Sequence, residues 1–111
     1  MSYMEAAFQL SFDAGDLRGG KDKQVSEVFK GKYRQIIEVR LQGHAILARH
    51  RASEPISVLC LSGNGVFRAG PNLEDEQLLT PGTLLLLDAE IDHEVVAEVG
   101  LHLLVTKFKS S

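Results

Sequence analysis

Two histidines far apart in the chain, His50 and His93, are the residues with the clearest chemical potential. Each lies at the end of an apolar run and beside a turn-rich segment. Neutral imidazole is a common ligand for transition metals. If two sequence-distant hairpins aim both rings into one interior, they create an apolar cavity that holds two imidazoles.

A metal bound there would need at least one further ligand. Catalytic zinc sites usually have three protein ligands, and non-haem iron oxygenases use two histidines and a carboxylate. Glu54 is the best candidate because it shares strand parity with His50, although Pro55 can end the strand before Glu54 turns inward. Three other residues are placed less favourably as ligands. Glu94 has the wrong strand parity relative to His93, His44 is expected in a solvated turn, and His102 on an outer or interface face.

The elements that must position these residues have the periodicity of strands. In 33–41, Ile37, Val39 and Leu41 share one face, which is the period-two pattern of a half-buried strand. Segments 57–61 and 83–87 are apolar on both faces and indicate covered strands. The predicted strands are 6–12, 24–29, 33–41, 45–50, 56–62, 65–69, 75–80, 83–87, 92–98 and 101–108. A single helical turn is the alternative for 24–29.

Turn residues separate the predicted strands. Gly63, Asn64 and Gly65 accept positive φ readily and therefore predict a tight hairpin between 56–62 and 65–69. Gly100 predicts a further turn, and segment 13–23 is glycine-rich and charged, which is typical of a surface loop. Short strands with regularly placed turns favour a sandwich or barrel. The acidic residues Asp88, Glu90, Asp92 and Glu94 are expected to form a solvated rim.

Composition narrows the class of protein. The chain has 111 residues, enough for one domain, with 44% hydrophobic and 24% charged residues, as in soluble globular proteins. The formal net charge is −3 and the basic residues are scattered, which argues against nucleic-acid binding. No window is long and apolar enough for a membrane span, and the N-terminus does not look like a signal peptide. A lone cysteine, Cys60, agrees with a cytoplasmic location.

With these residues in view, the chain resembles the cupin superfamily, specifically small single-domain cupins of the cupin 2 type, from about residue 33 to 108. In the second cupin motif, Gly82 matches the opening glycine and His93 the motif histidine. Three positions depart from that motif: Asp88 replaces the usual proline, Glu90 the usual glycine and Ala97 the usual asparagine. The first cupin motif is counted back from Gly63. Ile56 then occupies the glutamate position, and Ala52 and His50 occupy the two histidine positions. The glycine that should open the motif, Gly43, lies one residue farther from His50 than the motif requires.

The resemblance implies an all-β, double-stranded β-helix, that is, a jelly-roll barrel. It also implies an interior pocket at the metal position and frequent dimerisation. Of the four family metal ligands, His50 and His93 are present, and Ala52 and Ile56 cannot coordinate a metal. The corresponding organisation is one domain over 1–111, with N-terminal strands and a loop in 1–32, the barrel in 33–108 and a tail in 109–111.

Two interpretations of the histidine pair remain open. The rings either share a divalent transition metal, such as zinc, iron, nickel or manganese, or line a metal-free pocket. Strand alternation predicts the rest of the pocket wall. The predicted lining residues are Ala52, Ile56, Val58, Cys60, Ile91 and Val95.

Three classes of function follow from this site. The first, which we favour, is a binding module for an unidentified small molecule, with or without a loosely bound metal. The second is a metal-dependent dioxygenase or isomerase, and the third is a non-catalytic structural cupin. The outward side chains of 83–87 need cover from water, which predicts either a homodimer or an overlying N-terminal strand.

Overall fold

Antiparallel β-strands build this protein, and no helix occurs in the part that the structure describes, residues 3–11 and 21–110 of a computed structural model. The strands are β1 (Lys23–Lys30), β2 (Arg34–Gln42), β3 (Ile46–His50), β4 (Ile56–Ala69), β5 (Asp75–Leu79), β6 (Leu84–Leu87) and β7 (His93–Phe108). In these same ranges, therefore, no helix is available that could cross a membrane.

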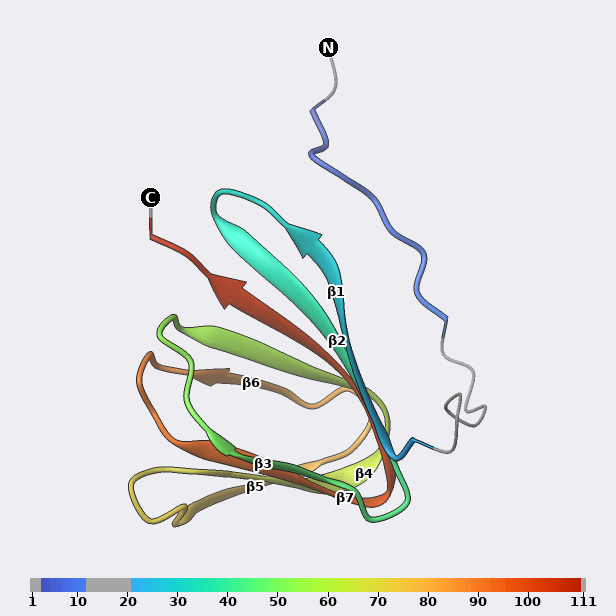
Figure 1. Cartoon of the computed structure of the whole chain (residues 1–111), viewed down its shortest axis with the longest axis vertical. Coiled ribbons are helices and arrows are strands. Elements are labelled where there is room, and N and C mark those ends of the chain that lie inside the picture. Colours follow the sequence, from blue (N-terminus) through green and yellow to red (C-terminus); the bar gives the residue numbers. More distant parts are fainter. Residues whose placement is uncertain (1–2, 12–20, 111) are drawn as a thin grey trace.

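The two longest strands, β4 and β7, form the centre of the sheet. They pair antiparallel from Ile56 opposite Lys107 to Ala69 opposite His93. One half of this ribbon is extended by β2 and β1 on the β7 side and by β6 on the β4 side. The other half is extended by β3 on the β7 side and by β5 on the β4 side. The sheet thus folds over onto itself and encloses an interior, as Figure 1 shows.

This arrangement confirms the predicted all-β jelly roll. Alternation along each strand sends one set of side chains inward. The core consists of apolar residues from every long strand, including Val39 of β2, Val58 and Phe67 of β4, and Val95 and Leu103 of β7. Leu79 closes the core from β5 and is fully buried.

Glycines at the bend of the central ribbon explain where the sequence-based prediction was wrong. Segments 56–62 and 65–69 are not two arms of a hairpin but one strand, and 92–98 and 101–108 are likewise continuous. The register shifts on both sides of Gly63, as in a β-bulge. Gly63 has φ 88° and Gly100, close to it across the ribbon, has φ 123°. Positive φ therefore bends two paired strands together at this point without reversing the chain.

Strand 24–29 is confirmed, and the helical-turn alternative is excluded. The predicted strand 6–12 is wrong over 6–11, which has no strand pairing, and residue 12 lies outside the described residues, as do 13–20 of the predicted loop. The segment 3–11 instead runs along the outer face beside β1 and β2 (Figure 1). Phe8 packs near Phe29 with ring centroids 6.0 Å apart, and Glu5 pairs with Arg34 at 3.0 Å.

The bend predicts a large difference between two glycine substitutions. A Cβ at Gly63 would lie against the backbone of Gly100, 2.7 Å from its carbonyl carbon, whereas Gly82 has a similar φ of 94° and nothing within 4 Å. Gly82→Ala should cost about 1–2 kcal/mol of unfolding free energy, from left-handed strain alone. Gly63→Ala should lower the unfolding free energy by at least about 2 kcal/mol more than Gly82→Ala does, because the backbone of Gly100 must move to make room for the added Cβ. Urea denaturation of both variants measures this, and equal losses would contradict the clash.

Candidate functional site

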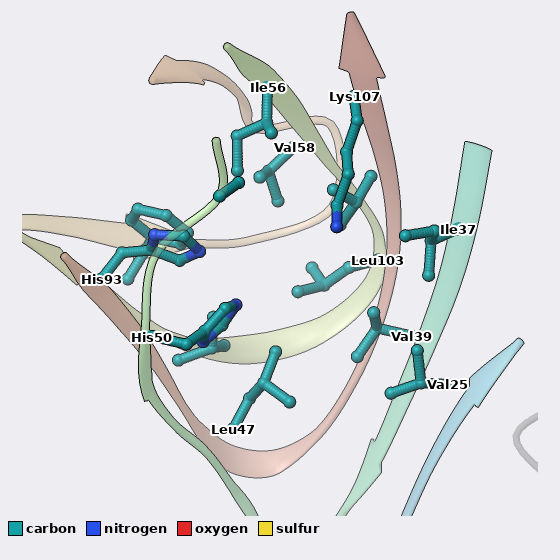
Figure 2. Close-up of a pocket in the computed structure, with 14 residues that line it drawn as sticks. Val25, Ile37, Val39, Leu47, His50, Ile56, Val58, His93, Leu103 and Lys107 are labelled. Atoms are coloured by element: carbon teal, nitrogen blue, oxygen red, sulfur yellow. The ribbon is translucent and has the colours of Figure 1, made fainter. Parts of the chain in front are cut away.

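A cavity of about 160 Å³ lies inside the curled sheet, between β3 and the start of β7 on one side and β1, β2 and the end of β7 on the other. Its wall is mostly aliphatic, and its polar side chains are His50, His93 and Lys107 (Figure 2). His93 is buried, with 4% of its surface exposed, whereas His50 is exposed. His50 therefore stands at the mouth of the pocket and His93 behind it.

The two histidines are direct cross-strand neighbours. His50 of β3 is the register partner of His93 of β7, which brings the ring centroids to 4.2 Å at an interplanar angle of 59°. Each Nδ1 lies close to the carbonyl oxygen two residues earlier, 2.8 Å from Ala48 and 3.0 Å from Ile91. A carbonyl only accepts, so each neutral ring carries its proton on Nδ1 and keeps Nε2 as an acceptor. Both rings point into the pocket in Figure 2.

The environment of His93 favours the neutral ring. Burial lowers the pKa of His93, and the neighbouring His50 and Lys107 lower it further, against the opposing effects of the Ile91 carbonyl and Asp92. Phe67 of β4 stacks on the imidazole at 5.4 Å with an interplanar angle of 12°. His93 is consequently an uncharged hydrogen-bond acceptor at neutral pH.

Ion pairs at the mouth position the histidine pair. Asp92, next to His93, accepts a hydrogen bond at 3.0 Å from Nε of Arg49 and one at 2.8 Å from Nε of Arg51. These arginines flank His50 in the chain. The hydrogen bonds from Arg49 and then Arg51 lower the pKa of the Asp92 carboxyl. The prediction that Asp92 belongs to a solvated acidic rim is therefore wrong. Its carboxylate instead links the end of β3 to the start of β7 through these arginines.

The structure brings most of the predicted pocket residues together, but not all of them. Ala52, Ile56, Val58 and Val95 line the cavity together with the two histidines. Cys60 and Ile91 do not line it, which corrects the prediction for both residues. Cys60 lies deeper in the core, close to the bend, with its thiol 3.5 Å from the carbonyl oxygen of Ser62. Burial raises the pKa of this thiol, which keeps it protonated.

Ile91 precedes β7, where strand alternation does not yet apply, and it lines a separate surface depression with Leu87. Glu54 lies outside the cavity wall, and His44 is exposed at the turn before β3. His102 is on the opposite face of the sheet, as expected, but it is buried there, with Nε2 2.7 Å from a carboxylate oxygen of Glu38.

Sequence reasoning missed much of the wall, above all Lys107. The remaining lining residues are Val25, Ile37, Val39, Leu47, Phe67, Leu103 and Val105. Alternation in 101–108 could have found Lys107, because it shares parity with Leu103 and Val105. A charged side chain near the end of a strand usually faces solvent, so alternation alone was not decisive. Only the three-dimensional register shows that this end of β7 still faces the cavity.

The donor set does not fit a resident transition metal. In residues 3–11 and 21–110, no three histidine, cysteine or acidic side chains gather in a way that could hold an ion. The pocket offers two imidazoles and an ammonium group, which repels a cation. A metal held by protein ligands alone would remain undercoordinated here.

Solved structures with the same fold include a cupin superfamily protein from Desulfitobacterium hafniense DCB-2. It has a TM-score of 0.75 and 14% identity, with 86% of this chain and 84% of that chain covered. A cupin 2 conserved barrel domain protein from Leptotrichia buccalis matches with a TM-score of 0.73 and 20% identity, over 86% of this chain and 44% of that chain. The polyketide cyclase RemF from Streptomyces resistomycificus matches with a TM-score of 0.68 and 13% identity, over 79% of this chain and 66% of that chain.

No protein-family model matches the sequence, and neither does any curated protein. The identities of these three neighbours are low, so the likeness establishes the architecture rather than the activity. The chain has the fold of a small cupin-type domain, as the sequence resemblance implied.

The lowered pKa of His93 predicts a pH-dependent stability. Below the ordinary histidine pKa of about 6.5, the unfolded chain binds a proton that the folded chain resists, so acidification favours unfolding. The contribution of His93 is complete above about pH 6.5 and is lost as the pH falls towards its folded pKa. In urea denaturation between pH 7.5 and 5, His93→Gln should flatten this decline.

The exposed His44 provides the control, because His44→Gln should leave the pH profile of the unfolding free energy unchanged. A His93→Gln profile parallel to that of the unmodified protein would contradict the assignment of a neutral, buried imidazole.

Proposed function

We propose that this protein is a small-molecule binding module whose ligand occupies the cavity between the histidine pair and Lys107. The observation that carries the proposal is the cavity itself, a space of about 160 Å³ that the protein's own side chains leave open. A cavity of roughly 150 Å³ accommodates a molecule about the size of benzene. A purely structural barrel would be expected to fill its interior, because packed cores are more stable.

The donor set supports a ligand pocket without a resident metal. Ala52 and Ile56 line the wall where the cupin resemblance would place two further ligands, and they provide an apolar surface. Lys107 adds a positive charge to the same space. An organic molecule with a hydrophobic body and a few polar atoms matches this surface better than a bare cation does.

Catalysis is a second candidate, and the histidine pair favours it. Two imidazoles that direct Nε2 into a partly closed pocket could remove a proton from a bound substrate. One protein of the same fold is named as a polyketide cyclase. If a transition metal such as zinc, iron, nickel or manganese binds, His50 and His93 would hold it with ligands supplied by the substrate or solvent.

Blocking the pocket tests the binding proposal. A library of small fragments is screened by thermal shift, since a ligand that binds only the folded state raises the melting temperature. Ala52→Leu places three extra carbon atoms in the cavity wall and should abolish the shifts. Ala48→Leu makes the same change at an exposed site outside the pocket and should preserve them.

The proposal is wrong if no fragment binds, or if the shifts persist in Ala52→Leu. Metal analysis of the untagged protein from the same preparation separates the candidates. We expect much less than one transition metal per chain. One equivalent that disappears in a His50→Ala, His93→Ala double variant would favour the metal-dependent enzyme.

We further propose that the protein is a homodimer that buries the outer face of β6. Leu84 and Leu86 are 62% and 76% exposed, and the segment 3–11 covers the β1–β2 side rather than this strand (Figure 1). A twofold contact would remove these leucines from water. We also propose a cytoplasmic location, where Cys60 remains reduced, which cell fractionation of the full chain tests.

A charge on β6 should therefore change the oligomeric state. In size-exclusion chromatography with light scattering, the unmodified protein should have twice the mass of one chain, and Leu86→Lys should give a monomer. Val99→Lys is the matched control, because Val99 is 78% exposed in another strand. A monomeric unmodified protein, or a Leu86→Lys dimer, would overturn the proposed contact.

A further inference from the structure

Lys107 is the one charged residue in the inward-facing row of the second half of β7. The row runs Leu101, Leu103, Val105, Lys107, and its other members are core or pocket-wall residues. In Figure 2, the Lys107 side chain extends along the wall and its nitrogen lies towards the middle of the cavity. A lysine that snorkels to bulk water would point the other way.

The Lys107 ammonium has no counter-charge within the part of the protein that the structure describes. Among residues 3–11 and 21–110, no carboxylate forms an ion pair with it, and none lines the cavity. Its register partners on either side are Gln35 of β2 and Ile56 of β4, which are both uncharged. Lysine is rarely drawn into an apolar site without a partner, because desolvation disfavours its charge. The missing partner can therefore come from the ligand.

The histidine pair sets a different requirement. With their protons on Nδ1 and directed at the carbonyl oxygens of Ala48 and Ile91, His50 and His93 present Nε2 as acceptors. An acceptor cannot satisfy a carboxylate, but it can bind the O–H or N–H of a ligand. The pocket thus has an anion-binding end at Lys107 and a donor-binding end at the imidazoles.

We propose that the pocket recognises a small hydroxylated monocarboxylate, with the carboxylate at Lys107, the hydroxyl at the imidazoles and a short aliphatic body between them. This inference rests on the proposed function, that is, on the cavity being a ligand site. A volume of about 160 Å³ restricts the ligand to roughly eight non-hydrogen atoms, on the scale of a benzene-sized guest. The Val, Ile and Leu side chains of the wall accommodate its hydrocarbon part.

Three matched compounds test the proposal, with binding to the full chain measured by calorimetry at pH 7.5. They are 4-hydroxy-3-methylbutanoate, its neutral amide, and 3-methylbutanoate, which lacks the hydroxyl. The affinity of the hydroxy acid should be at least about tenfold higher than that of the amide, as expected for a charge-assisted hydrogen bond. It should also bind severalfold more tightly than the acid without the hydroxyl.

Lys107→Met keeps most of the side-chain length and removes the charge, so it should abolish the preference for acid over amide. Its melting temperature without ligand should be equal to or higher than that of the unmodified protein, because an unpaired ammonium is removed from an apolar wall. Lys30→Met removes an exposed lysine at the end of β1 and should leave the preference intact.

The outcomes distinguish an error in the ligand class from an error in the binding function. If the amide binds as well as the acid, or if Lys107→Met keeps the preference, the anion assignment is overturned. If neutral fragments bind in the pocket but none of the three compounds does, the ligand class is wrong and the binding function stands. If neither fragments nor these compounds bind, both are wrong.

Discussion

The antiparallel pairing of β4 with β7 is the constraint on which the rest of the molecule depends. Each strand changes partners halfway along its length, so one ribbon serves both layers of the barrel. The change of layer requires both strands to bend at the same level, which Gly63 and Gly100 make possible through positive φ. Without this shared bend, β3 and β2 would not lie on opposite sides of one cavity, and His93 and Lys107 could not face the same ligand.

The fold could be predicted from the sequence because the alternation of 33–41, the doubly apolar segments and the spaced turn residues are local signals. The errors arose where a local signal has two structural meanings. Gly63-Asn64-Gly65 permits positive φ in a hairpin and equally in a bulge within a long strand. Only the partner strand, with its own glycine at 100, decides between them, and that pairing is not a local property of the chain.

The candidate site was less predictable than the fold: the two histidines could be found from the sequence, but several residues of the pocket wall could not. His50 and His93 stood out because each is polar at the border of an apolar run, and the cupin resemblance related their positions to each other. For Lys107 the signal was weaker: its parity with Leu103 and Val105 points inward, but a lysine near the end of a strand usually faces solvent. Cys60 does face inward, as its parity with Ile56 and Val58 predicted, but it lies in the packed core beyond the cavity. Ile91 failed as a pocket residue because it precedes β7, where strand alternation does not yet apply.

The arginine and aspartate contacts at the pocket mouth have a consequence for the behaviour of the protein in different buffers. Arg49 and Arg51 are 46% and 57% exposed in their side chains, so added salt screens their attraction to Asp92. The packing of the apolar interior does not depend on this attraction between charges. Among the described strands, β3 pairs with β7 alone, so salt should loosen β3 and leave the barrel intact. Ion pairs thus hold the entrance of the pocket while apolar packing holds the barrel, so ionic strength can act on the entrance without unfolding the protein.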